Sequence, residues 1–274
     1  MGWPAFAVMI PAVGLFSVFL LFLWAQRKRA VKYLPRIQRA TQQRRLDPSA
    51  GPVLRVVSLN VHGLPWPICG KCDDRMRDLQ SFVRKYNGVD LFVFQEVFSG
   101  TFERALVDTL GPEWTIVVAD LKRFPKLVAS GLMAATRLPV LKADALCFGG
   151  GAGNDAWADK GYLGITVRTS NGKEVTVANT HLQNRGERNS SATHRRQMHL
   201  VSALSNDIVV GDFNTPPGAG LEVNGKSMVA PATATFPETN QTLDYAYSGY
   251  PGHAATLPDV VSDHWPVMFE FDVS

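Results

Sequence analysis

The sequence predicts an α/β fold in which packed β-sheets lie between outer helices. Many short apolar runs rich in β-branched residues read as strands, whereas few segments have helical spacing. Many short strands with few helices are typical of sheets packed together with helices outside them. The chain has 274 residues, which is enough for one domain with a substantial core.

The N-terminal segment differs sharply from the rest of the chain. Residues 1–25 carry no charged side chain and end in an almost wholly apolar run. About 20 apolar residues in a helix span the hydrocarbon core of a bilayer, so we expect a single-pass transmembrane anchor at 1–25. A cleaved secretory signal is the alternative, but such signals carry positive charge before the apolar run and small residues at a cleavage site. Here the basic residues follow the run, which predicts a cytoplasmic domain.

Residues 26–52 are polar and basic and end in a turn-rich stretch, so they read as a linker to a single domain at 53–274. Residues 1–50 contain eight lysines and arginines against one acid, which leaves 20 against 23 for the rest of the chain. Duplex binding depends largely on basic side chains that neutralise phosphates. The mildly acidic domain therefore predicts no stable nucleic-acid complex, whereas the basic linker suits anionic lipid headgroups.

The three cysteines predict no metal site. Cys69 and Cys72 form a C-x-x-C motif and Cys147 stands alone. A structural zinc site usually needs four ligands, commonly two such pairs, and the sequence has no second pair. We expect reduced cysteines, and the odd count suits a reducing compartment.

The elements follow from hydrophobic periodicity and turn residues. The first strand is expected at 53–59, and a helix at 75–86 has Asp73 or Asp74 as a possible cap. A continuous apolar run at 89–97 reads as a strand buried on both faces. The other predicted elements are helices at 102–110 and 194–204 and strands at 115–119, 131–136, 164–169, 175–180, 208–210, 244–247 and 267–271. The glycine-rich patch at 149–153 has no predicted role.

Polar side chains that can bind a metal ion or phosphate stand repeatedly at the ends of these apolar strands. When strands share a sheet or a sandwich, side chains at their ends converge on one rim and form a rigid platform. The residues concerned are Asn60, Glu96, His181, Asp212, Asn214, Asp244, Asp263 and His264.

These residue types are suited to phosphate hydrolysis. Carboxylate and amide oxygens suit magnesium, which keeps several waters and takes phosphate oxygens from the substrate. Histidines and an aspartate can transfer protons and stabilise transition-state charge. No G-x-S-x-G nucleophile motif is present, so water is the inferred nucleophile. Taken singly, Glu96 could be a surface carboxylate, Asp244 a turn former and His181 a satisfied half-buried histidine.

The motifs in their order resemble the endonuclease/exonuclease/phosphatase superfamily. They are L-N at 59–60, Q-E at 95–96, S-G-L at 130–132, T-H-L at 180–182, G-D-F-N at 211–214, L-D-Y at 243–245 and S-D-H at 262–264. They cover nearly all of residues 53–274. The resemblance implies a four-layered α/β sandwich, with two central sheets flanked by helices and a divalent metal at the rim.

The resemblance also implies roles for the residues. The implied metal ligands are Glu96, Asn60 and Asp263, with Mg²⁺ as the ion and Mn²⁺ as an alternative. Asp212 and Asn214 would orient the attacking water or contact the phosphate, and His181 would hold a phosphate oxygen. His264, paired with Asp244, would be the general base or a charge stabiliser. Whether Asp212 or His264 takes the proton stays open.

Within the superfamily, the K-G step at Lys160, after Asp159, is similar to the neutral sphingomyelinase branch, as is the segment 60–65. Lys160 would contact the lipid phosphate or exchange position with Asp159; a surface turn is the alternative. Together with the anchor, the acidic domain and the apolar segment 64–68, this predicts a sphingomyelinase- or phospholipase C-like hydrolase of a membrane lipid phosphodiester. The alternatives are a membrane-attached nuclease, a nucleotide or inositol phosphatase, and a catalytically silent binding module.

Overall fold

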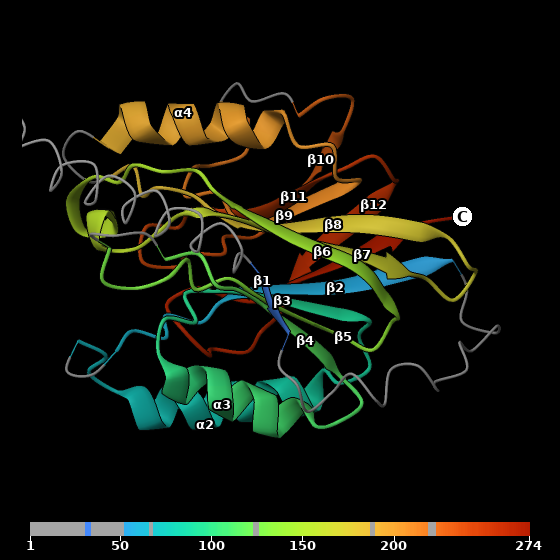
Figure 1. Ribbon diagram of the computed structural model, residues 1–274, viewed down its shortest axis with the longest axis horizontal. Helices are drawn as coiled ribbons and strands as arrows, with labels where there is room; N and C mark the ends of the chain where they lie inside the picture. The colour runs from blue at the N-terminus through green and yellow to red at the C-terminus, as the bar shows by residue number, and fades with distance from the viewer. Residues whose placement is uncertain (1–30, 34–51, 66–67, 123–125, 187–189, 219–222) are drawn as a thin grey trace, which may run out of the picture.

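Two mixed β-sheets stack face to face in the computed structural model of the protein (Figure 1). The structure describes residues 31–33, 52–65, 68–122, 126–186, 190–218 and 223–274. The predicted anchor at 1–25 and most of the predicted linker at 26–52 lie outside these residues. Within the described ranges, no helix is long and apolar enough to cross a bilayer.

The first sheet has seven strands in the order β1-β4-β5-β3-β2-β13-β12. β2 and β3 run parallel, and every other neighbouring pair is antiparallel. The strands are β1 (Val31–Tyr33), β2 (Val53–Asn60), β3 (Leu91–Gln95), β4 (Thr115–Ala119), β5 (Met133–Thr136), β12 (Gly252–Thr256) and β13 (Val267–Asp272).

The second sheet has six strands in the order β10-β11-β9-β8-β7-β6. Here β8 and β9 form the parallel pair, and the other neighbours are antiparallel. The strands are β6 (Val140–Cys147), β7 (Gly161–Arg168), β8 (Glu174–His181), β9 (Ile208–Asp212), β10 (Ser227–Val229) and β11 (Asp244–Ser248).

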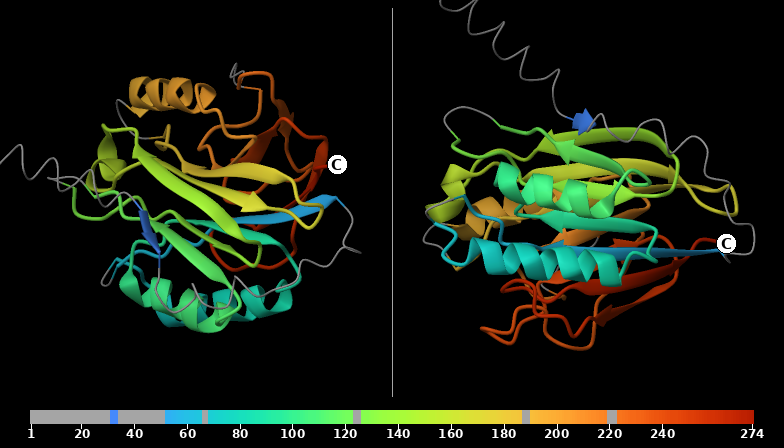
Figure 2. Two further views of the ribbon diagram at one scale, coloured as in Figure 1. Left: turned by 45° about the vertical axis from the view of Figure 1, so that its right-hand side comes forward. Right: turned by 90° about the horizontal axis from the view of Figure 1, so that it is seen from below.

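Helices cover the outer faces of both sheets. α2 (Cys72–Lys85) and α3 (Gly100–Leu110) lie on the first sheet, and α4 (Ser190–Ser202) lies on the second (Figures 1 and 2). α2 buries Leu79, Phe82 and Val83 because their spacing places them on one side of the helix. A short 3-10 helix, η1 (Gly153–Trp157), precedes β7. The predicted arrangement of two sheets between helices is confirmed.

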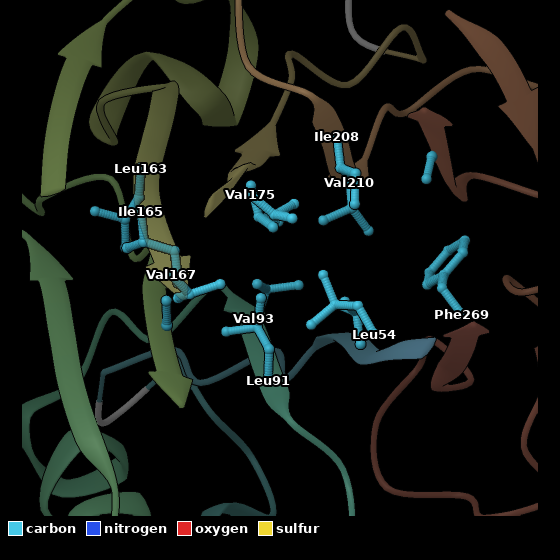
Figure 3. Close-up of a cluster of buried hydrophobic side chains, with 14 of the residues drawn as sticks. Leu54, Leu91, Val93, Leu163, Ile165, Val167, Val175, Ile208, Val210 and Phe269 are labelled. Carbon is cyan, nitrogen blue, oxygen red and sulfur yellow. The ribbon is translucent and has the colours of Figure 1, made fainter. Parts of the chain in front are cut away.

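The main core fills the space between the two sheets (Figure 3). Alternation along β2 divides its side chains between two layers, because successive residues of a strand point to opposite faces. Leu54 and Val56 face the second sheet, whereas Val57 and Leu59 pack against the residues under α2 and α3. Each such buried side chain contributes roughly 1.5–3 kcal/mol relative to an exposed one, so both faces of β2 hold the sandwich together.

A buried amide network joins the two sheets at the end where the parallel strands finish. Asn179 on β8 donates to the carbonyl oxygens of Phe94 (2.8 Å) and Met133 (3.1 Å) on the first sheet. Its own Oδ1 accepts a hydrogen bond from Gln95 Nε2 at 2.8 Å, and the same Nε2 lies 3.1 Å from Ser58 Oγ. Asn179 therefore fixes the separation of the sheets just below this rim.

The first predicted helix begins earlier than expected. α2 starts at Cys72, its N-cap is Lys71, and no side chain caps it. Asp73 and Asp74 lie inside the first turn, so the prediction that one of them is the cap is wrong. In the first turn, their carboxylates instead face the partial positive charge of the helix N-terminus.

Four strands were missed by the sequence prediction. β6, β10 and β12 are short or partly exposed edge strands without a continuous apolar run. β1 lies within the predicted linker and forms the edge of the first sheet beside β4, with Val31 opposite Ala119. Hydrophobic periodicity is a weak signal in β6, β10 and β12 because most of their side chains are exposed or half-buried.

Replacing Gly211 by Ala should destabilise the fold. Gly211 has a φ of 146°, and a Cβ atom there would lie 2.0 Å from the carbonyl oxygen of Thr180. We expect a loss of roughly 2–4 kcal/mol in the free energy of unfolding, measured by urea denaturation. Gly88→Ala is the matched control, because a Cβ atom there would meet no atom within 4 Å. Equal stability of the two variants would contradict the prediction.

Candidate active site

The polar residues selected from the sequence meet at one rim of the sandwich. Asn60 pairs in register with Gln95 across β2 and β3, and His181 pairs with Asp212 across β8 and β9. Asp244 begins β11 opposite Asp212. The parallel strands of each sheet finish at the same end, and the Asn179 network holds these ends together. The predicted convergence of strand ends is confirmed.

The backbone at this rim adopts unusual conformations. His62, Glu96 and Asn214 have φ angles of 45°, 58° and 51°, and Asn240 is the fourth non-glycine residue with positive φ among the described residues. Such conformations cost of order 1–3 kcal/mol each and persist only where the surroundings fix them. Here the amides of Val61 and Gly63 donate to the carbonyls of Gln95 and Glu96, both at 3.0 Å. The strained backbone conformations therefore lie at the same rim as the polar side chains.

Asn60 links the two sheets through its side chain. Its Nδ2 lies 3.1 Å from Glu96 Oε1 and 3.1 Å from Asp212 Oδ2. Its Oδ1 accepts a hydrogen bond from the amide of His62 at 3.0 Å. Two carboxylates from different sheets are thus held on either side of one buried amide.

His264 is bound tightly to an acid. Its Nδ1 lies 2.8 Å from Asp244 Oδ2, and its Nε2 lies 3.7 Å from Asp212 Oδ2. Thr235 Oγ1 donates to the same oxygen of Asp244 at 2.7 Å. Burial lowers the pKa of His264, but attraction to the carboxylates of Asp244 and Asp212 outweighs burial and raises the pKa to about 10. At neutral pH this imidazole is protonated.

Asp212 is the buried acid at the centre of the cluster. Burial raises its pKa to about 7, although the positive charge of His264 counteracts part of this rise. Its Oδ1 accepts the backbone N–H of Asn214 at 2.8 Å. A carboxyl group with a pKa near 7 can accept and release a proton at neutral pH, which suits it to general-base chemistry.

The oxygen donors fit a hard divalent cation. Glu96 and Asp212 provide carboxylate oxygens, which Mg²⁺ prefers as ligands, on either side of the amide nitrogen of Asn60. The amide oxygen of Asn60, predicted as a ligand, accepts the backbone N–H of His62. Asp212, Asp244 and His264 also form a compact group, with one ligand atom from each within 4.8 Å of the others. His264 is already held by Asp244 through a hydrogen bond of 2.8 Å at Nδ1, whereas Glu96 has an exposed side to its carboxylate. This favours the Glu96 side of the cluster.

His181 lies in a different electrostatic environment from His264. Lys160 Nζ lies 2.9 Å from His181 Nε2 and 3.0 Å from Asp155 Oδ1. Burial lowers the pKa of His181 well below its usual value, and the positive charge of Lys160 lowers it further, so the imidazole is neutral. Lys160 is only 1% exposed. The alternative interpretation of Lys160 as a surface turn is therefore wrong.

Two predicted site residues make their side-chain contacts outside the group formed by Asp212, Asp244 and His264. Asn214 Nδ2 donates to the carbonyl oxygen of Leu182 at 2.9 Å. Asp263 Oδ2 lies 2.7 Å from His62 Nδ1, and Asp263 is absent from the compact group formed by Asp212, Asp244 and His264. Burial raises the pKa of Asp263, but the hydrogen bond from His62 outweighs it and lowers the pKa to about 2.

Sequence reasoning missed three residues that shape the rim. His62 holds Asp263, Asp155 pairs with Lys160, and Asn179 joins the sheets. His62 stands two residues after Asn60 in a turn, so its position beside a predicted ligand was the available signal. Asp155 follows the glycine-rich patch and gave no signal of its own.

The cysteines differ from the prediction. Cys69 and Cys72 form a disulfide, whereas Cys147 is free. Their three-residue separation at the start of α2 brings the Cα atoms to 5.4 Å, within the reach of a disulfide. The expectation of reduced cysteines is thus wrong for this pair.

The glycine-rich patch leads into η1, which carries Asp155. Gly149, Gly150 and Gly153 have positive φ angles, which glycine adopts at little cost. Gln183, two residues after His181, accepts the backbone N–H of Ala152 at 2.9 Å and donates to Asp155 Oδ2 at 3.0 Å. The patch therefore lets the chain fold back onto the end of β8.

Comparison with characterised proteins supports the resemblance seen in the motifs. No protein-family model matches the sequence. Sphingomyelin phosphodiesterase 5 of Danio rerio is 29% identical over 156 residues, which cover 46% of this chain and 28% of that protein. The Mus musculus protein of the same name is 36% identical over 88 residues, covering 30% of this chain and 18% of that protein. The matched segments thus span less than a third of either relative.

Solved structures share the fold. A variant of beta toxin from Staphylococcus aureus with bound magnesium ions has a TM-score of 0.67 and 19% identity, covering 79% of this chain and 98% of that chain. An endonuclease/exonuclease/phosphatase from Beutenbergia cavernae has a TM-score of 0.57 and 18% identity, covering 80% and 71%. These likenesses confirm the fold that the motifs predicted.

The pair of Asp244 and His264 predicts a stability that depends on pH. The pKa of His264 is about 10 in the folded chain against 6.5 ordinarily, so its contribution is complete below about pH 6.5 and is lost as pH rises through about 10. Asp244→Asn should lower the free energy of unfolding by roughly 3 kcal/mol at about pH 6 and by much less at about pH 10. Urea denaturation at both pH values measures this.

The control for this prediction is Glu270→Gln, which removes the surface ion pairs of Glu270 with His253 and Arg55. Because His253 is 74% exposed in its side chain, we expect a change below about 1 kcal/mol at either pH. An effect of Asp244→Asn that is the same at both pH values would show that His264 is not held protonated by Asp244.

Proposed function

We propose that this chain, which has the fold of the endonuclease/exonuclease/phosphatase superfamily, is a metal-dependent phosphodiesterase that hydrolyses the headgroup phosphodiester of a membrane lipid. The observation that carries this proposal is that metal-binding oxygen atoms and two buried histidines lie together at one rim of the sandwich. Carboxylate oxygens from Glu96 and Asp212, joined by the amide of Asn60, lie beside two histidines with opposite protonation states. Such a site can bind a cation and a phosphate and can accept a proton from water.

Glu96 and Asn60 would hold Mg²⁺, with Mn²⁺ as the alternative. Asp263 lies outside this pair of ligands and would position His62 through their hydrogen bond. When bound, the ion supplies Lewis-acid polarisation of a phosphoryl oxygen. The beta toxin structure described above contains magnesium ions. The hard oxygen donors of this chain support the same choice.

We assign the proton transfer to Asp212. Its pKa of about 7 lets it accept a proton from the attacking water near neutral pH, whereas His264 is already protonated. His264, held by Asp244, then stabilises the negative charge that develops on the phosphorus-bound oxygens. Neutral His181, with the cationic Lys160 beside it, would hold another phosphate oxygen. Asn214 would keep Asp212 in place through its backbone N–H.

Two grounds support the lipid substrate. The curated relatives are sphingomyelin phosphodiesterases, and a membrane segment at 1–25 would keep the domain at a lipid surface. Tethering of this kind raises the effective concentration of a membrane substrate. The basic residues after the segment favour a cytoplasmic domain. The disulfide of Cys69 and Cys72 favours the opposite side of the membrane, because disulfides are typical of oxidising compartments.

Headgroup release should depend on the metal and on Glu96. The purified full chain in detergent would be incubated with sphingomyelin, phosphatidylcholine, phosphatidylglycerol or plasmid DNA, with magnesium or with EDTA. We expect release from a lipid with magnesium, and a loss of at least about 100-fold with EDTA or in Glu96→Gln, because the cation stabilises transition-state charge.

The matched control is Glu174→Gln, which removes a carboxylate that is 57% exposed at the other end of β8 and should leave release unchanged. Nicking of DNA without lipid hydrolysis would place the chain among nucleases with the same site. Activity on neither substrate class would count against the proposed reaction.

Replacing His264 by Ala should reduce turnover far more than substrate binding. The protonated imidazole acts on charge that exists only in the transition state, so kcat should fall by about 100-fold or more while KM changes little. Initial rates over a range of lipid concentrations measure both constants. Near-normal kcat in this variant would exclude His264 from the role assigned here.

A further inference from the structure

We propose that the active-site rim is also a membrane-docking surface, formed by the exposed side chains of Leu127, Leu146 and Trp157, and that β1 brings the membrane segment to the same end of the domain. The occupant of this surface is the interface of a lipid bilayer. The inference rests on the proposed membrane attachment and adds to it the orientation of the domain.

Large apolar side chains are exposed on two loops that are bonded to each other. Trp157 is 58% exposed and Leu127 is 62% exposed. The carbonyl oxygen of Trp157 accepts hydrogen bonds from the amides of Leu127 (2.8 Å) and Val128 (3.2 Å). Tryptophan is enriched where membrane and water meet, because its ring is apolar and its N–H is polar. Exposed apolar groups held by backbone bonds in this way are suited to insertion into a bilayer interface.

This surface lies directly beside the candidate active site. Ala158 forms a parallel bridge with Val128, and two residues later Lys160 reaches His181. Lys126 Nζ donates to the carbonyl oxygen of Ala156 at 2.7 Å, which holds the two loops together. Leu146 is 50% exposed and lies near the end of β6 that meets the start of β7. A bilayer in contact with these residues would present its headgroups to the site.

β1 fixes where the preceding chain reaches the domain. β1 lies at one edge of the sandwich (Figure 2) and is antiparallel to β4. Since β4 and β3 are both antiparallel to β5, β4 points in the same direction as β3, whose end leads into Glu96. Val31 pairs with Ala119, the last residue of β4. The chain therefore enters β1 at the rim end of the first sheet.

The length of chain before β1 limits the distance to the bilayer. The uncharged segment ends at Ala25, and Val31 is six residues farther along. At most about 3.5 Å per residue, six residues reach about 20 Å. Three of the intervening residues are Arg27, Lys28 and Arg29, which are attracted to anionic headgroups. A membrane segment at 1–25 thus places the rim end, and with it Leu127 and Trp157, toward the bilayer.

The test measures contact with lipid directly. In the full chain with Cys147→Ser, either Leu127→Cys or Leu141→Cys is labelled with an environment-sensitive fluorophore and placed in phosphatidylcholine/phosphatidylserine vesicles that contain spin-labelled lipid. Leu141 is the matched control, because it is 40% exposed at the opposite end of β6. We expect quenching at position 127 and none above background at position 141. Equal quenching at the two positions would overturn the docking surface.

A second measurement tests the role of β1. About ten flexible Gly/Ser residues, which can add tens of ångströms of reach, are inserted between residues 29 and 30 or, as the control, between residues 40 and 41. Only the first insertion lengthens the chain between the membrane segment and β1, so quenching at position 127 should fall in that variant alone. Equal quenching in both variants would overturn the proposal that β1 sets the orientation.

Both measurements remain informative if the chain has another activity. Quenching at position 127 together with absent headgroup release would leave the docking surface standing and reject the proposed substrate. Headgroup release without quenching at position 127 would support the proposed substrate and reject the docking surface. Repeating the labelling in Glu96→Gln, which should dock normally, separates lipid contact from hydrolysis.

Discussion

The arrangement of the rim depends on one buried amide between the sheets. Asn179 makes hydrogen bonds to the first sheet with both ends of its side chain, immediately below the residues that form the site. A buried polar group without partners is costly, so these bonds strongly favour a single registration of one sheet against the other. Because Glu96 stands on one sheet and His181 and Asp212 on the other, their mutual placement follows from this contact.

The two buried histidines of the rim have different protonation states, although both lie near the same acid. Both histidines are buried within 4 Å of Asp212. His264 also has Asp244 at hydrogen-bonding distance, so it carries a proton, whereas burial and then the charge of Lys160 lower the pKa of His181 and keep it neutral. The ion pair with Asp155 keeps Lys160 in place, so an acid in η1 influences the histidine through the lysine. The two protonation states thus depend on burial and on the direct partner of each histidine.

Much of this molecule could be predicted from its sequence because central strands and strand ends carry strong signals. β3 and β9 are buried on both faces and read as continuous apolar runs, and polar residues directly after such runs converge. Edge strands such as β12, with Gly252 and exposed residues, lack that signal. The side-chain partners of Lys160 and Asp263 are contacts across the fold that no local pattern encodes. The disulfide of Cys69 and Cys72 likewise depends on where α2 begins.

The pairing of β1 with β4 also affects the solubility of the domain. Without β1, the backbone N–H and C=O groups along the outer side of β4 would be open to another chain, and such edges promote aggregation. A shortened chain that begins at Pro52, where the rest of the domain starts, lacks this cover. A protein shortened to remove the apolar segment should therefore keep Val31 and all residues after it. A protein cut after Tyr33 would be a poor substitute for the intact domain, even with every residue of the rim in place.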